Sequence, residues 1–188
     1  MNTKLLGKTL VASALVLTTL GTGFHSSYLG LDTNKVVKTA KAEEKTNTEI
    51  WQGVKKSLID SNIISGNEGE TVKITFLLNN GQSTNIESTA NHDNFTNTKN
   101  DFSKLTKIEI TKINIPGNDF NTTVDANETW NKFTKYLLDN GLVSKGDKVT
   151  IHTKDSQDPQ ISGTVGSDKN DQKGYNLNKR DINKITIE

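Results

Sequence analysis

The sequence predicts an α+β protein made of two tandem helix–β-hairpin–strand units that pack as one compact body. The first observation behind this prediction is a repeat: residues 49–110 recur as residues 128–187, and a fixed internal spacing marks a repeated structural unit. The second is that each copy opens with apolar residues at helical spacing and continues with alternating apolar and polar residues. We therefore assign residues 1–42 to an export signal, 43–117 to the first unit and 118–188 to the second.

The repeat keeps its register over the length of a unit. Gly69–Ile74 aligns with Gly146–Ile151, and Leu105–Ile110 aligns with Ile182–Ile187, both at an offset of 77 residues. A register kept over this distance indicates two copies of one supersecondary unit.

Each copy is expected to open with an amphipathic helix. The apolar positions at helical spacing in the two copies are Trp51, Val54 and Leu58, and Trp130, Phe133 and Leu137. Thr48 and Asn127 stand where an N-cap is expected, with a glutamate in the first turn of each helix. We interpret the two tryptophans as anchors that bury against the sheet.

The strands follow each helix. In the first copy Val72, Ile74 and Phe76 alternate with polar residues, and Asn79–Gly81 is a hairpin turn signal. The second copy has Val149 to Thr153, a turn over Asp155–Pro159 and a return strand from Ile161. Each copy closes with an apolar strand, and the first closing strand is expected to continue through Ile113 and Ile115 until Pro116-Gly117 ends it.

The N-terminal segment has the features of a secretory signal. Lys4 and Lys8 precede the apolar run 10–20, which is too short to span a bilayer comfortably. Small residues at Ala40 and Ala42 predict cleavage before residue 43, although a cut near residue 23 stays open because the intervening stretch is long. We expect a secreted protein, released or held loosely at the cell surface, with no transmembrane span after processing.

Composition excludes several function classes. The chain has no cysteine, which excludes disulfides, thiolate metal sites and a cysteine nucleophile. Residues 43–188 carry 18 of the 23 basic and 21 of the 22 acidic residues. This mildly acidic balance gives no electrostatic reason to bind nucleic acid, so we expect no nucleic-acid partner.

No residue is expected to be catalytic, cofactor-binding or metal-ligating. His92 lies in a polar loop and His152 lies on a strand facing away from the core, and neither has partners at a spacing that a site requires. Residues 168–174 resemble a calcium loop superficially, but Lys173 stands where the sharp turn needs glycine and no bidentate glutamate follows. We interpret this stretch as a polar, mobile hairpin connection.

Other charged residues also favour ordinary structural roles. Asp155 and Asp158 stand in a turn, where aspartate next to proline is common. The lysines on the outer helix faces are expected to be solvated, with at most weak attraction for an acidic partner; they are Lys55, Lys56, Lys132 and Lys135.

The order of elements resembles a known family of secreted proteins. The helix from Glu49, the hairpin Phe76–Gly81 and the closing strand Phe102–Ile110 are similar to the MAP repeat of staphylococcal extracellular adherence proteins. They also resemble the C-terminal β-grasp domain of superantigens and superantigen-like exoproteins. The resemblance implies that the two units are β-grasp-like halves, and it carries no binding residue over.

One departure from that family concerns the strands before the first helix. A MAP repeat begins with a hairpin, whereas only residues 43–48 precede the first helix here. The first copy is therefore not a complete β-grasp domain. Residues 107–115 and 120–124 are candidates to supply the missing strands to the second copy.

The resemblance implies a virulence-associated exoprotein of the immune-evasion or adhesion type, which binds a host extracellular or neutrophil protein. The alternative is a secreted inhibitor of a host or bacterial enzyme such as a serine protease. A cell-wall-associated enzyme is the least favoured class, because the sequence shows no catalytic constellation.

Overall fold

The computed structural model of the protein describes residues 43–188. The export signal assigned to residues 1–42 lies outside this range. Within the described residues, no helix combines the length and the apolar character that crossing a membrane requires.

Nine strands, three α-helices and one 3-10 helix make up the described part of the chain. In chain order they are β1 (Glu43–Thr46), α1 (Asn47–Asp60), β2 (Glu70–Leu78), β3 (Ser83–Thr89), β4 (Lys99–Lys112), α2 (Gly117–Phe120), β5 (Thr123–Asp125), α3 (Ala126–Asp139), β6 (Lys148–Thr153), β7 (Ile161–Thr164), β8 (Asn176–Asn178), η1 (Lys179–Asp181) and β9 (Ile182–Ile187).

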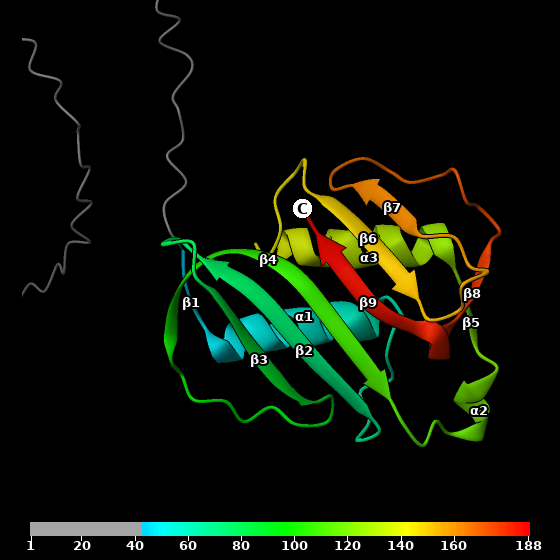
Figure 1. Ribbon diagram of the computed structural model, residues 1–188, viewed down its shortest axis with the longest axis horizontal. Helices are drawn as coiled ribbons and strands as arrows, with labels where there is room; N and C mark the ends of the chain where they lie inside the picture. The colour runs from blue at the N-terminus through cyan, green and yellow to red at the C-terminus, as the bar shows by residue number, and fades with distance from the viewer. Residues whose placement is uncertain (1–42) are drawn as a thin grey trace, which may run out of the picture. The chain divides into compact units, whose positions relative to one another are not determined.

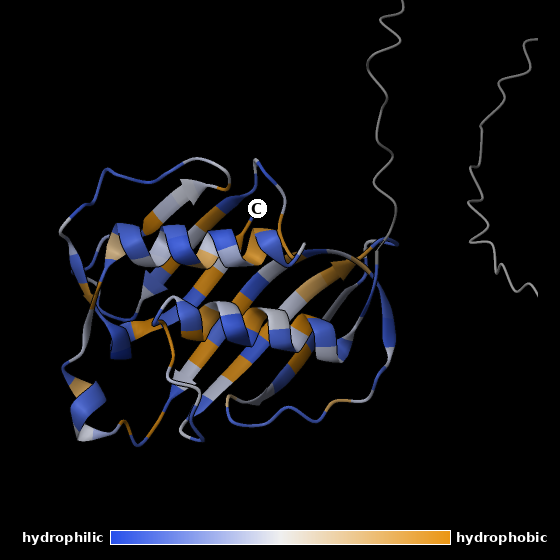
Figure 2. Ribbon diagram, turned by 180° about the vertical axis from the view of Figure 1, so that it is seen from behind, coloured by the Kyte–Doolittle hydropathy of each residue, from blue (hydrophilic) through white to orange (hydrophobic). Residues whose placement is uncertain are grey.

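Seven of the strands form one antiparallel sheet. Its order is β3-β2-β4-β9-β6-β7, and β1 pairs with the N-terminal part of β4. The helices α1 and α3 lie on the same face of this sheet, which leaves the other face without a helix (Figure 1 and Figure 2). β5 and β8 form a separate two-stranded sheet. The predicted α+β class is therefore confirmed.

Residue alternation decides which side chains face the helices. On β2, Val72, Ile74 and Phe76 are buried, while Lys73 and Thr75 between them are only partly buried. The predicted hairpin after β2 is present, with Gly81 at a φ of 82° and a backbone hydrogen bond from Leu78 N–H to the Gln82 carbonyl at 2.8 Å.

The centre of the sheet is the pair formed by β4 and β9. Ile108 lies directly opposite Ile185, with Lys107 opposite Thr186 and Glu109 opposite Lys184. The two isoleucines are fully buried and stand 77 residues apart. The pairing thus joins the closing strand of one sequence copy to that of the other.

Both closing strands carry an irregularity at the same place. The β2–β4 register shifts after Thr75, which leaves Thr106 without an opposite residue. The β6–β9 register shifts after His152, which leaves Asn183 without one. Thr106 and Asn183 are also 77 residues apart, so the extra residue bends the two strands at matching positions.

The two long helices begin earlier than the sequence predicted. Thr46 caps α1: its hydroxyl accepts the Glu49 N–H at 3.1 Å, and the Glu49 carboxylate accepts the Thr46 N–H at 2.7 Å. Asp125 caps α3 through the Glu128 N–H at 2.9 Å. The predicted caps Thr48 and Asn127 were therefore wrong, because each lies inside its helix.

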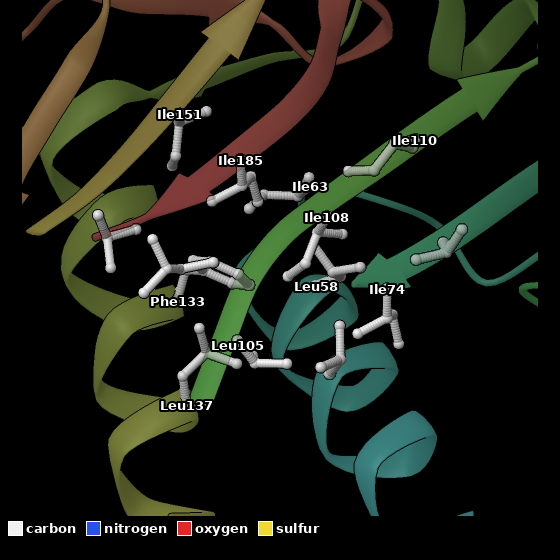
Figure 3. Close-up of a cluster of buried hydrophobic side chains, with 14 of the residues drawn as sticks. Leu58, Ile63, Ile74, Leu105, Ile108, Ile110, Phe133, Leu137, Ile151 and Ile185 are labelled. Carbon is white, nitrogen blue, oxygen red and sulfur yellow. The ribbon is translucent and has the colours of Figure 1, made fainter. Parts of the chain in front are cut away.

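The core lies between the two helices and the sheet. Figure 3 shows Leu58 from α1 and Phe133 and Leu137 from α3 beside Ile108 and Ile185, and all five are fully buried. Burying such side chains supplies the main driving force for folding.

Both tryptophans are buried, as predicted, and each finds a partner for its indole N–H. Trp51 and Trp130 have exposed fractions of 0% and 1%. Trp51 Nε1 donates to the His92 carbonyl at 3.0 Å, and Trp130 Nε1 donates to the Val149 carbonyl at 2.9 Å.

The segment that joins the two halves differs from the prediction. β4 ends at Lys112, and Asn114 takes a φ of 49°, so Ile113 and Ile115 do not extend the strand. Residues 120–124 do not join the main sheet either, since Phe120 ends α2 and β5 pairs with β8. A left-handed residue turns the chain away from the sheet at this point.

Candidate functional site

The two histidines lie in different surroundings. His92 contributes only its backbone carbonyl to the Trp51 contact, and its side chain is exposed. His152 lies on β6 with Nε2 3.1 Å from the Thr186 hydroxyl. Burial, and then the charge of Lys184, lowers the pKa of His152, so the neutral ring is favoured.

The segment 168–174 is docked against α3, and its description as a mobile connection was wrong. The Lys169 side chain is 4% exposed and donates to the Ser162 carbonyl at 2.7 Å and to Asp171 at 2.6 Å. Asn131 exchanges hydrogen bonds with the Lys169 backbone at 2.9 and 2.8 Å. Among residues 43–188, no group of three or more histidine and acidic side chains is placed to hold a metal ion.

The turn aspartates make separate contacts. Asp155 accepts the Gln157 N–H at 2.9 Å, which is a local turn bond. Asp158 accepts the Tyr175 hydroxyl at 2.9 Å and raises the pKa of that phenol.

The helix lysines form ion pairs with nearby acids. Three pairs link residues four apart on a helix, with N–O distances from 2.5 to 2.6 Å: Lys56–Asp60, Lys132–Glu128 and Lys135–Asp139. Lys55 lies 2.7 Å from Asp93 in the loop after β3. Local pairing of this kind neutralises these faces.

A cluster of buried charged side chains, which the sequence did not reveal, joins the end of β4 to the segments around α2 and η1. Glu70 is 5% exposed, and its carboxylate accepts the backbone N–H groups of Ser65, Gly66 and Asn67 at 2.9, 2.7 and 3.2 Å. The loop after α1 is therefore wrapped around one carboxylate, which satisfies donors that would otherwise be buried without partners.

Two lysines complete the cluster. Lys112 donates to the carbonyls of Ile63, at 2.7 Å, and Lys179. Burial lowers the pKa of Lys112 to about 8, against the opposing effect of Glu70. Lys179 is 5% exposed; its ammonium donates to the Ser65 hydroxyl at 2.5 Å and lies 3.3 Å from Asp119 Oδ1.

The geometry of Ser65 indicates a structural role. A serine nucleophile needs a neighbouring base, yet the Ser65 hydroxyl donates to Asp119, and this bond is the main reason that the pKa of Asp119 is lowered. A carboxylate with a lowered pKa is a weak base. The cavity beside these groups has a volume of about 10 Å³, which is room for about one water molecule. The buried charge cluster therefore ties the two halves together.

The outer side of the buried charge cluster presents apolar surface. Ile113 and Phe120 are 58% and 47% exposed, the two highest values among the large hydrophobic side chains of residues 43–188. The Arg180 guanidinium lies 4.1 Å from the centre of the Phe120 ring, and Nη1 donates to the Phe120 carbonyl at 3.0 Å. We call Ile113, Phe120 and Arg180 the corner patch; it surrounds α2, at a corner of the molecule in Figure 1.

Sequence reasoning missed the corner patch for identifiable reasons. Ile113 looked like the continuation of an apolar strand, and only Asn114, which tolerates a positive φ, signalled the turn. Lys112 and Lys179 had the appearance of solvated lysines, because their partners are distant in sequence.

The fold and the cluster define a cysteine-free α+β protein in which one sheet spans both halves. The chain belongs to the family described as a domain of unknown function (DUF4888), whose model matches residues 46–187. The search of curated proteins gave no match for this chain.

Proposed function

We propose that the protein is a secreted host-interaction exoprotein of the immune-evasion or adhesion type, which binds a host extracellular or neutrophil protein through the corner patch. The observation that carries this proposal is the corner patch itself: the two most exposed large hydrophobic side chains of the described residues flank one arginine. Aromatic residues and arginine are enriched at protein interfaces and among the residues that carry binding energy.

The rigidity of the corner patch supports a binding role. Arg180 is fixed by its contacts with Phe120 and by Asp181 at 3.6 Å. Beneath it, Lys179 and Asp119 hold α2 against the first half of the chain. A surface held in one conformation before binding loses little conformational entropy on association.

We further propose that residues 43–117 and 118–188 are two related units, β-grasp-like halves that share one sheet. The Ile108–Ile185 pair and the matching bulges at Thr106 and Asn183 support this proposal. In this arrangement the corner patch lies at the junction of the units, so its shape depends on both.

A second candidate function is inhibition of a host or bacterial enzyme such as a serine protease. The observation that favours it is the position of α2, a short segment at the corner of the molecule whose base is anchored by Lys179. An inhibitor uses a rigid exposed segment of this kind. Residual activity of neutrophil serine proteases, measured with excess protein, separates inhibition from binding alone.

The proposal is tested by capture with matched variants. Wild type, the double variant Ile113→Ser with Phe120→Ser, and the control Tyr175→Ser, which alters an exposed aromatic outside the corner patch, are immobilised and exposed to plasma and neutrophil lysate. Quantitative mass spectrometry should find a protein that wild type and the control retain and the double variant loses. A double variant that folds and captures the same proteins would contradict the proposal.

A further inference from the structure

The two strands at the ends of the sheet order, β3 and β7, have backbone groups that point away from the sheet. In an antiparallel pair, residues alternate between those bonded to the partner strand and those whose N–H and C=O face outward. The bonds Leu78 N–H to Gln82 and Ala90 N–H to Glu70, at 2.8 and 2.7 Å, set this alternation for β3. They place the backbone groups of Ser83, Asn85 and Glu87 on the outer edge.

The corresponding edge of β7 is closed by the chain itself. Val165 N–H donates to the Asp147 carbonyl, so Ser162 and Thr164 face outward on this strand. The Ser162 carbonyl accepts the buried Lys169 ammonium at 2.7 Å, and the Thr164 carbonyl accepts the Ser167 N–H at 3.1 Å. Both outward carbonyls of β7 are therefore occupied.

The edge of β3 has no such cover in the described part of the chain. Within residues 43–188, no hydrogen bond reaches the outward backbone groups of Ser83, Asn85 or Glu87, and all three residues are exposed. The strand also has none of the devices that discourage edge pairing: it contains neither proline nor lysine, and its register with β2 is regular.

We propose that β3 pairs with β3 of a second copy of this chain, antiparallel and around a two-fold axis at Asn85. In this register Asn85 faces the partner's Asn85, and Glu87 faces the partner's Ser83. No like charges are opposed, and Glu87 already lies 3.8 Å from Lys73 on β2. This dimer goes beyond the proposed binding function and does not depend on it.

The closed edge of β7 determines the size of the assembly. Because the other end of the strand order is blocked by Lys169 and Ser167, pairing through β3 stops at two copies instead of continuing as a fibre. The contact consists of one strand edge and buries less than the roughly 1,600 Å² of a standard interface. We therefore expect a weak dimer with a micromolar or higher dissociation constant.

The test measures the mass of the purified protein by sedimentation equilibrium from low micromolar to high micromolar concentration. Asn85→Pro removes an outward N–H without breaking a bond to β2, and Asn85→Lys places two lysines opposite each other at the two-fold axis. Thr164→Pro and Thr164→Lys make the same changes on the closed edge and serve as controls. Circular dichroism verifies the fold of each variant.

We expect wild type and both Thr164 variants to dimerise, and Asn85→Lys to raise the dissociation constant at least about tenfold, with partial recovery in high salt. Hydrogen exchange gives a second measurement that needs no variant: the amides of Asn85 and Glu87 should exchange more slowly at high protein concentration, while those of Thr84 and Ile86 do not change. A monomer at all concentrations, open-ended polymers, or a dimer that Asn85→Lys leaves intact would overturn the proposal.

Discussion

Ile108 and Ile185 face each other across the β4–β9 pair, and they occupy the same position in the two sequence copies. The pairing on either side of them exchanges equivalent residues, since Lys107 faces Thr186 and Glu109 faces Lys184. A local two-fold relation of this kind lets one strand type serve as the centre of a sheet built from both copies.

Shortening either central isoleucine should destabilise the protein by a similar amount. Ile108→Ala and Ile185→Ala each leave a cavity in a fully buried site, which costs about 2–5 kcal/mol of the free energy of unfolding. Urea denaturation measures both values. Ile113→Ala is the control, and we expect a change within about 0.5 kcal/mol for this exposed residue. Values for the two core variants that differ several-fold would contradict an equivalent role.

Gly163 is required by its closeness to Trp130. A Cβ at Gly163 would lie 2.7 Å from the Trp130 ring, and the rigid, fully buried indole has no space to move into. Gly163→Ala should therefore lower the melting temperature by several degrees. Gly117→Ala, where nothing lies within 4 Å of a new Cβ, should leave it nearly unchanged. Equal melting temperatures for the two variants would show that α3 is not seated on β7 as described.

The Lys169 side chain should contribute to stability as well as to the closure of the β7 edge. Lys169→Met leaves the Ser162 carbonyl without its donor, and an unsatisfied buried polar group costs about 1–3 kcal/mol. Lys173→Met changes an exposed lysine of the same loop and should have little effect. If both variants unfold at the same urea concentration as wild type, the docking of this loop is not a stabilising contact.

The stability contribution of Lys112 should increase with pH. Its pKa in the folded protein is about 8, against 10.5 for the ordinary side chain, so between these values the unfolded chain binds more protons than the folded one. The free energy of unfolding therefore rises through this window, by at most about 3 kcal/mol. The neutral amine still carries two hydrogens for the Ile63 and Lys179 carbonyls.

The comparison with Lys112→Met isolates this effect from other groups that titrate. Unfolding free energies of wild type and variant are measured in urea at neutral pH and near pH 10, and their difference should shift in favour of wild type at the higher pH. A difference that does not change with pH, or that shifts toward the variant, would mean that Lys112 is not buried as a cation.

Local patterns were sufficient to predict the helices, the hairpins and the burial of Trp51 and Trp130, because each depends on residues that are close in sequence. The buried charge cluster depends on contacts such as Lys112 with Lys179, which lie 67 residues apart. A lysine that will be buried carries no local sign of it. The corner patch was missed for the same reason, because its apolar residues continued an apparent strand.

The central claim is that the corner patch binds a protein partner. Its most direct test is the dissociation constant between the purified captured partner and the variants Phe120→Ser and Tyr175→Ser, measured by calorimetry beside wild type. The account predicts at least about tenfold weaker binding for Phe120→Ser, because residues that carry an interface cost more than 1–2 kcal/mol when truncated, and unchanged binding for Tyr175→Ser. Equal dissociation constants for wild type and a folded Phe120→Ser variant would contradict it.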